Sequence, residues 1–167
     1  MVHFIHLMPL CIPDNMSKKP MPISDEDYKK VNEAITAVKD DGKEIRSIFE
    51  SYYEEEVDID WEVDAAVDAF SIFSSRWTVE ILATLYIAGD RRFNELRKLL
   101  RGISSRTLSD KLTKCVETGL VDRVVETTSP VKVTYQLTEH GRDAGRLLGP
   151  LVAYMKIYQG RVTRHSM

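Results

Sequence analysis

Cysteine is scarce in this 167-residue sequence, and long hydrophobic runs are missing from it. Two cysteines, Cys11 and Cys115, are too few for a disulfide framework and lack the spacing of a zinc site. No apolar stretch approaches the roughly 18 residues that span a membrane. The opening MVHFIHLMPLCIP is apolar but has no basic start and no small-residue cleavage site, so a secretory signal is not expected. We therefore predict a soluble cytoplasmic protein without a membrane partner.

The signatures of catalysis are also missing. The sequence has no clustered nucleophile and base, no glycine-rich phosphate loop and no metal-ligand spacing. His140 comes just before Gly141 at an expected helix start, which is typical of a surface residue. His3, His6 and Cys11 share the N-terminal stretch without forming a convincing metal site. We predict that the protein is not an enzyme and needs no metal or cofactor.

Charge divides the chain into an acidic first part and a basic remainder. Residues 1–63 contain 7 Lys and Arg against 15 Asp and Glu, whereas residues 64–167 contain 16 against 11. A basic part of this kind favours an anionic partner such as nucleic acid, although both parts can equally be ordinary solvated surface.

The N-terminal third divides into a tail and a helix. Four prolines and no clear period predict a flexible tail over residues 1–22, and an acidic amphipathic helical extension follows over 23–60 with Ser24 as its cap. Its apolar residues recur at alternating steps of three and four. A gap falls at Gly42, where glycine costs about 1 kcal/mol relative to alanine, so the helix is expected to bend or break there. The stripe either meets another subunit or lies on its own domain, and its length favours the first.

Residues 61–138 are expected to form a domain whose elements follow a known order. Apolar periodicity predicts four helices, at about 61–73, 76–88, 93–100 and 104–118. Alternating residues then predict two strands, at 121–127 and 131–137, joined by a turn at Thr128, Ser129 and Pro130. This is the order of a winged helix-turn-helix. The predicted fold class is therefore mainly α with a small β-hairpin.

The joint between the third and fourth helices is specified by local signals. Gly102 permits a tight turn, and Ser104 is a natural N-cap for the helix that follows. Ile103 and Leu108 have the spacing of a hydrophobic staple, which fixes the angle at which that helix leaves the turn. The short third helix is expected to bury its apolar side chains, Phe93, Leu96, Leu99 and Leu100.

The fourth helix has the two faces that a DNA-reading helix needs. Leu108, Leu112 and Cys115 cluster on one side and predict a buried face. The other side carries short hydroxyl groups, which allow close approach to bases, and an arginine, which can bond guanine through two hydrogen bonds. For Asp110, on the same side, three roles are open. Its carboxylate repels phosphate groups, accepts a hydrogen bond from a cytosine amino group, or orients the Arg106 side chain. The candidate DNA-binding residues here are Ser104, Ser105, Arg106, Ser109, Thr113 and Lys114. The same pattern also fits a plain exposed polar face.

Further basic and hydroxyl side chains on the hairpin and before the third helix can reach phosphate groups. These wing and flank candidates are Arg91, Arg92, Arg123, Thr128, Ser129 and Lys132.

After the hairpin, Thr138 caps a helix over 139–160, which Gly149 and Pro150 are expected to kink. Residues 161–167 are expected to be a tail.

Several pieces of the sequence resemble the HxlR-type winged-helix transcriptional regulators, which are relatives of the MarR group. In order, the matching pieces are WTVEIL at 77–82, GDRRFNELR at 89–97, GISSRTLSDKL at 102–112, ETGLVDR at 117–123 and YQLTEHG at 135–141. The resemblance extends more weakly back to about Val63 and forward through the C-terminal helix.

This resemblance implies a prokaryotic cytoplasmic homodimer that binds double-stranded, pseudo-palindromic promoter DNA. It implies a recognition helix at residues 104–118, a wing at 126–132 and extra N-terminal and C-terminal dimerisation helices. On the C-terminal helix the implied dimer residues are Leu147, Leu148, Leu151, Met155 and Tyr158. A pocket between the dimer helices and the domain can hold a small-molecule effector, which no residue identifies.

The sequence departs from the family pattern in two ways. Many members carry a redox-sensing cysteine at the position of Asp64, so the usual thiol switch is absent, and Cys115 is expected to be a buried, inert thiol. The acidic helix in 23–60 is outside the usual pattern and is a candidate to enlarge the dimer interface. An alternative function is a winged helix that binds another protein and not DNA.

Overall fold

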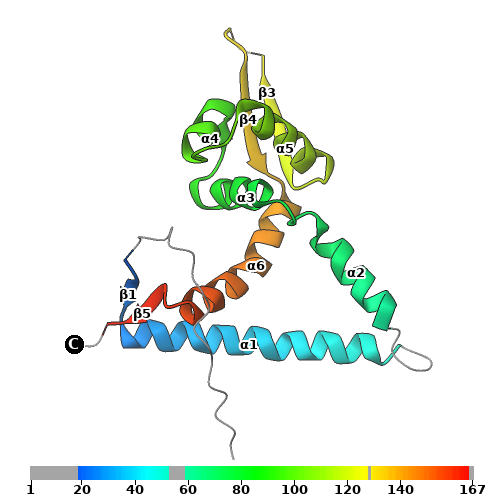
Figure 1. The fold of residues 1–167 in the computed structure, drawn as a ribbon, viewed down its shortest axis with the longest axis vertical. Helices are drawn as coiled ribbons and strands as arrows, with labels where there is room; N and C mark the ends of the chain where they lie inside the picture. The colour runs from blue at the N-terminus through cyan, green and yellow to red at the C-terminus, as the bar shows by residue number, and fades with distance from the viewer. Residues whose placement is uncertain (1–18, 53–58, 128, 166–167) are drawn as a thin grey trace, which may run out of the picture.

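The computed structural model describes residues 19–52, 59–127 and 129–165 of the chain (Figure 1). Its elements follow in the order β1 (Met21–Ile23), α1 (Asp25–Glu50), α2 (Ile59–Ser71), α3 (Arg76–Ala88), β2 (Arg91–Arg92), α4 (Phe93–Leu99), α5 (Ser105–Glu117), β3 (Val121–Glu126), β4 (Lys132–Leu137), α6 (Glu139–Tyr158) and β5 (Val162–Arg164). The predicted class, mainly α with a small hairpin, is confirmed.

The core of the molecule lies between α3, α4, α5 and an antiparallel sheet with the strand order β2-β4-β3. Its fully buried side chains come from all of these parts and include Ile81, Leu96, Leu108, Leu112 and Leu120. Burial of such side chains is the main favourable term in folding, at roughly 1.5–3 kcal/mol for each. This winged helix-turn-helix unit is therefore held together by one continuous apolar cluster.

The short helix α4 differs in one respect from the expectation for residues 93–100. Leu96 and Leu100 are buried, but Leu99 is 52% exposed. The helix ends at Leu99, and Leu100 has φ −87° and ψ 77°, outside the helical region. The prediction that Leu99 is buried was wrong.

α1 runs without a break from Asp25 to Glu50, so the expected break at Gly42 is not present. One exposed ion pair spans the glycine, between Lys43 and Asp40 at 2.8 Å, and another follows it, between Arg46 and Glu50 at 2.7 Å. Each such pair adds a few tenths of a kcal/mol to a helix, and together they offset part of the cost of glycine.

Parts of the two predicted tails form a small sheet. β1 and β5 pair in parallel, with Met21 opposite Val162 and Ile23 opposite Arg164. The Arg164 guanidinium also lies over the Tyr28 ring of α1, 4.6 Å from its centroid. The expectation of a flexible tail over residues 1–22 was therefore wrong at β1, and β5 lies within the stretch 161–167 that was expected to be a tail. Residues 1–18, 166 and 167 lie outside the described residues.

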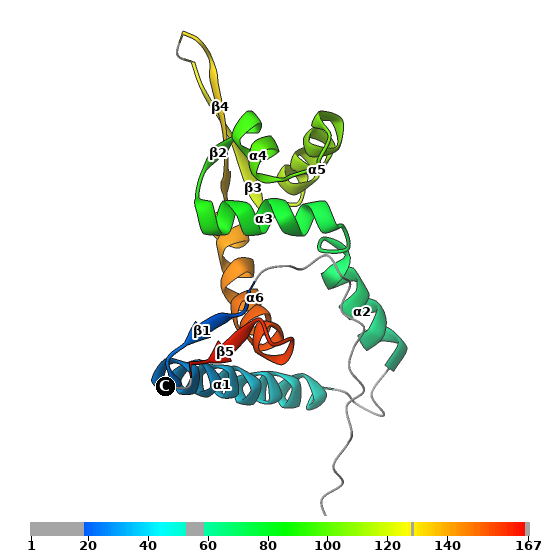
Figure 2. The same ribbon diagram turned by 60° about the vertical axis from the view of Figure 1, so that its left-hand side comes forward.

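α1 lies apart from the winged unit, and α2 and α6 run between them (Figures 1 and 2). α6 is one helix that continues through Pro150, with Thr138 as its cap, and its far end packs on α1. α2 buries none of its 13 residues. In the described parts of the chain, no helix is long and apolar enough to cross a membrane.

Candidate nucleic-acid interface

The start of α5 is fixed by its own sequence. Ser104 Oγ accepts the Thr107 N–H at 3.0 Å, which confirms the predicted cap. Gly102 has φ 88°, a conformation that glycine adopts at little cost, and it makes the tight turn from α4. Ile103 and Leu108 are both buried, as the predicted staple requires. The direction in which α5 leaves the turn is therefore set locally.

The inner face of α5 is locked into the core. Leu108, Leu112 and Cys115 are at most 1% exposed, and the helix packs on α3 and β3. Burial raises the pKa of the Cys115 thiol to about 11, so this thiol is neutral at physiological pH. The prediction of a buried cysteine is confirmed. A helix held in this way can present its other face without moving.

The outer face of α5 is free to meet a partner. The six candidate residues there, Ser104, Ser105, Arg106, Ser109, Thr113 and Lys114, are all exposed. Within the described residues, no carboxylate pairs with the Arg106 guanidinium, and Asp110 does not orient it. Lys114 lies 3.8 Å from Glu117 in an exposed pair, which contributes little because water screens it.

Arg97 is a further residue of this surface. Its Nη1 donates a hydrogen bond of 2.8 Å to Ser105 Oγ, so α4 braces the first turn of α5. No spacing rule in the sequence points to this pair, because the two residues are eight positions apart across a turn. The bond holds a cationic group beside the exposed start of α5.

The hairpin of β3 and β4 extends beyond the helices of the winged unit (Figures 1 and 2). Arg123 is exposed on β3, and Lys132 is half-buried on β4 opposite Glu126. Ser129 is exposed at the turn, whereas Thr128 lies outside the described residues. The hairpin has the position of a wing, and its candidate residues are distributed along its length.

Arg91 and Arg92 do not join the α5 surface. They form β2, which pairs with β4 at the edge of the sheet opposite β3, and α5 packs on β3. Arg91 is half-buried and donates to the Asp90 carbonyl oxygen at 2.6 Å. Arg92 is exposed, and its N–H donates to the Glu95 carboxylate at 2.7 Å, which caps α4. The two arginines therefore flank α4 at a separate place.

The C-terminal helix α6 has an uncovered apolar side. Leu147, Leu151, Met155 and Tyr158 are between 39% and 79% exposed, and Leu148 is half-buried. Large apolar side chains gathered along one helix face are typical of a protein interface.

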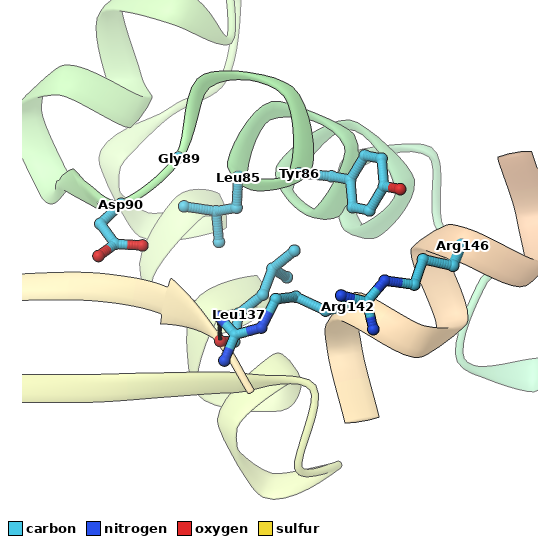
Figure 3. Close-up of a pocket in the computed structure, with 7 residues that line it drawn as sticks. All are labelled: Leu85, Tyr86, Gly89, Asp90, Leu137, Arg142 and Arg146. Carbon is cyan, nitrogen blue, oxygen red and sulfur yellow. Dashed lines mark hydrogen bonds between the residues drawn. The ribbon is translucent and has the colours of Figure 1, made fainter. Parts of the chain in front are cut away.

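A cavity of about 250 Å³ lies between the end of α3 and the start of α6 (Figure 3). Two arginines of α6 line it. Arg142 Nη1 donates to the Leu137 carbonyl oxygen at 2.7 Å, and Arg146 Nη1 donates to the Asp143 carboxylate at 2.6 Å. The apolar Leu85 and the ring of Tyr86 form another part of its lining. The Asp90 carboxylate also lines the cavity, which therefore combines two cationic groups, one anionic group and an apolar wall.

Known proteins share the sequence and the fold of this unit. A protein of Mycobacterium tuberculosis, the HTH-type transcriptional regulator Rv3095, is 44% identical over 75 residues, which are 45% of this chain and 46% of that protein. The HTH-type regulator YvaP of Bacillus subtilis is 35% identical over 50% of this chain and 76% of its own. The chain thus matches about half the length of the mycobacterial relative.

Solved structures agree with the sequence relatives. The reduced form of the regulator YodB from B. subtilis is 31% identical, with a TM-score of 0.51 over 55% of this chain and 88% of YodB. A MarR-family regulator from Enterococcus faecalis is 26% identical, with a TM-score of 0.53 over 64% of this chain and 94% of its own. The HxlR-like helix-turn-helix family matches residues 72–163, more than half of the chain. The chain belongs to the HxlR-like helix-turn-helix family.

Proposed function

We propose that the protein is a transcriptional regulator that binds promoter DNA sequence-specifically as a homodimer. The observation that carries this proposal is the outer face of α5, where an unpaired Arg106 lies among short hydroxyl side chains on a helix whose inner face is buried. A major groove about 12 Å wide admits such a helix, and arginine bonds guanine O6 and N7 together. We assign base reading to Arg106, Ser105, Ser109 and Thr113.

We assign the remaining candidates to the DNA backbone, where charge and hydroxyl donors fix the register of the protein without reading sequence. On α5 and the hairpin these are Ser104, Lys114, Arg123, Thr128, Ser129 and Lys132. Arg91 and Arg92 lie at the other edge of the sheet, so their contacts require DNA that extends past α4. Arg97 joins this group because it already bonds Ser105 beside the start of α5.

The homodimer is supported by the uncovered face of α6 and by the family to which the chain belongs. Two copies related by a two-fold axis place two α5 helices on half-sites of opposite orientation. Major grooves on one face of B-DNA recur about every 34–36 Å, so the operator is expected to be pseudo-palindromic.

The replacement Arg106→Ala tests base reading. We expect it to weaken binding to the fragment that the protein selects from a random DNA pool by roughly 1–3 kcal/mol, with little effect on unselected DNA. Fluorescence anisotropy at fixed salt measures both affinities. Lys29→Ala removes the same charge from an exposed site on α1 and is the matched control. Equal losses on both kinds of DNA would move Arg106 from base reading to backbone contact.

A protein-binding winged helix without DNA affinity is the alternative function. It predicts that no selected fragment is bound with the linear dependence of log affinity on log salt that phosphate contacts produce. That outcome, in a folded protein, would exclude the regulator proposal.

The cavity of Figure 3 is our proposed place for a small-molecule effector, and its two arginines, against the one carboxylate of Asp90, favour an anionic one. An organic acid that raises the Tm of the parent but not that of an Arg146→Gln variant would support this assignment. Equal shifts in both proteins would exclude it.

A further inference from the structure

The carboxyl half of α1 has an apolar face that the described chain leaves open. The amino half is held in place, since Ile35 is buried and Lys39 Nζ lies 4.9 Å from the centroid of the Tyr154 ring of α6. Farther along, the large apolar side chains Ile45, Ile48 and Phe49 are about half exposed or more, and so is Tyr52, just past the helix end. Short isolated helices are marginal in water, and glycine at position 42 weakens this one further. This half of α1 therefore needs an apolar cover.

α2 has the same need. Val63, Val67 and Phe70 are between 54% and 63% exposed, and no other described element packs closely along the helix. Thirteen residues are about the length at which an isolated helix is marginal even with good helix formers. A persistent α2 therefore implies a partner on its apolar face.

α1 and α2 line a cavity of about 450 Å³ that is open to solvent on one side. Its apolar lining comes from both helices: Ile45, Phe49, Ile59, Val63 and Ala66. Charged side chains stand beside this lining, with Arg46 paired to Glu50 and Glu62 opposite them. A space of this size and character accommodates a few aliphatic side chains carried on another helix.

α6 carries side chains of the matching shape. Leu147 and Leu151 are 79% and 50% exposed and lie one turn apart on its outer face, where they form a ridge. Charge also matches. α2 has four acidic side chains and no basic one, whereas α6 has three basic and two acidic side chains. Opposite charge on facing surfaces fixes the register and suppresses wrong partners.

A groove and a matching ridge on one chain are the requirement for a two-fold dimer, in which each residue pair occurs twice. In its own chain the Leu147 ridge is exposed, so it does not occupy the cavity. We propose that Leu147 and Leu151 of each copy enter the α1–α2 cavity of the other copy, so that α1 clamps the partner. The proposal rests on the homodimer proposed above. It adds α1, which lies outside the family match at residues 72–163.

Disulfide trapping tests the contact directly. Two full-length chains with different tags, both carrying Cys11→Ser, receive Phe49→Cys in one case and Leu151→Cys in the other. Because each chain then has one introduced thiol and the buried Cys115, a mixed disulfide forms only where α1 of one copy meets α6 of another. We expect the mixed disulfide to exceed both like-with-like disulfides. Val131→Cys, 65% exposed on the wing, replaces Phe49→Cys in the control and should give none.

A second measurement guards against distortion by the cysteines. Phe49→Asp is expected to raise the dimer dissociation constant at least tenfold in sedimentation, with helix content unchanged by circular dichroism. Ser47→Asp adds the same charge on the opposite side of α1 and should leave the dimer constant within about twofold. Equal dimer dissociation constants for the two variants would overturn the clamp.

The outcomes separate this proposal from the homodimer itself. If the only disulfide that forms joins the Leu151→Cys positions of two copies, the clamp is overturned and the homodimer proposal stands. A monomer at all accessible concentrations would overturn both. A mixed disulfide that forms only after deletion of residues 1–18 would also overturn the clamp, because the chain's own N-terminus would then be the occupant of the cavity.

Discussion

The replacement Gly141→Ala is expected to destabilise the protein at the joint between the winged unit and α6. Gly141 lies in the first turn of α6, and its N–H donates to Thr138 Oγ1 at 2.9 Å. The Thr138 N–H in turn donates to the Leu120 carbonyl oxygen at 3.1 Å. These hydrogen bonds hold the start of α6 close to the Leu120 backbone, at the end of the turn that follows α5. A Cβ at Gly141 would overlap the Leu120 carbonyl oxygen and lie 3.3 Å from Leu137 Cδ2.

The expected loss follows from what would have to move. The Leu120 oxygen is backbone and already accepts a hydrogen bond, so it cannot swing aside as a flexible side chain would. Overpacking a rigid site costs about 1–3 kcal/mol. The higher helix propensity of alanine offsets part of this cost, by at most about 1 kcal/mol. The net loss should be about 1–2 kcal/mol, and each kcal/mol lowers the Tm of a chain of this size by about 2–4 °C.

Urea unfolding and thermal melting followed by circular dichroism measure this loss. The matched control is Gly42→Ala in α1, where a Cβ meets nothing within 4 Å and only the gain in helix propensity remains. That variant should be as stable as the parent or more stable. If Gly141→Ala were also at least as stable as the parent, the close contact with Leu120 would be refuted.

Three further outcomes are expected. Burial raises the pKa of Cys115 from 9.0 to about 11, so in a Cys11→Ser variant the folded protein should resist alkylation at neutral pH. The stability that the neutral thiol contributes is complete below about pH 9 and is lost as the pH rises through 11. Fast labelling of the folded state would contradict this. Leu108→Ala deletes a fully buried side chain and should cost about 2–5 kcal/mol in urea unfolding, whereas a loss below 1 kcal/mol would mean that the site collapses. Arg97→Ala removes the bond to Ser105 and should weaken DNA binding in anisotropy by roughly 1 kcal/mol with little change in stability; unaltered affinity would make the bond purely structural.

The parts of the fold that could be predicted from the sequence are those specified by neighbouring residues. The cap at Ser104, the turn at Gly102 and the hairpin each depend on side chains within a few positions, so their signals are visible in the sequence. The two faces of α5 follow from helical periodicity alone. The residues assigned to DNA on that helix are accordingly exposed, although their contact with bases is still a prediction.

The features that escaped prediction depend on packing between elements or on residues that are distant in the sequence. β1 and β5 are three-residue strands from opposite ends of the chain, too short to show an alternating pattern. The Arg97–Ser105 bond crosses a turn. Leu99 is exposed although it shares the apolar spacing of the buried Leu96, because only one of the two neighbouring leucines at 99 and 100 packs into the core. In each case the outcome is decided by packing that no local rule contains.

The helix α6 connects the proposed DNA surface to the proposed dimer surface. At its start, two glycines let the winged unit approach closely: Gly141 meets the Leu120 backbone, and the Tyr86 ring occupies the space where a Cβ of Gly145 would be. At its far end, the same helix packs on α1. Because one continuous helix connects both contacts, a change in how α6 sits against Leu120 or Tyr86 would rotate α5 relative to α1 and, in the proposed homodimer, relative to the partner copy. The cavity beside Tyr86 is therefore well placed to alter the separation of two α5 helices, and with it the fit to a pseudo-palindromic operator.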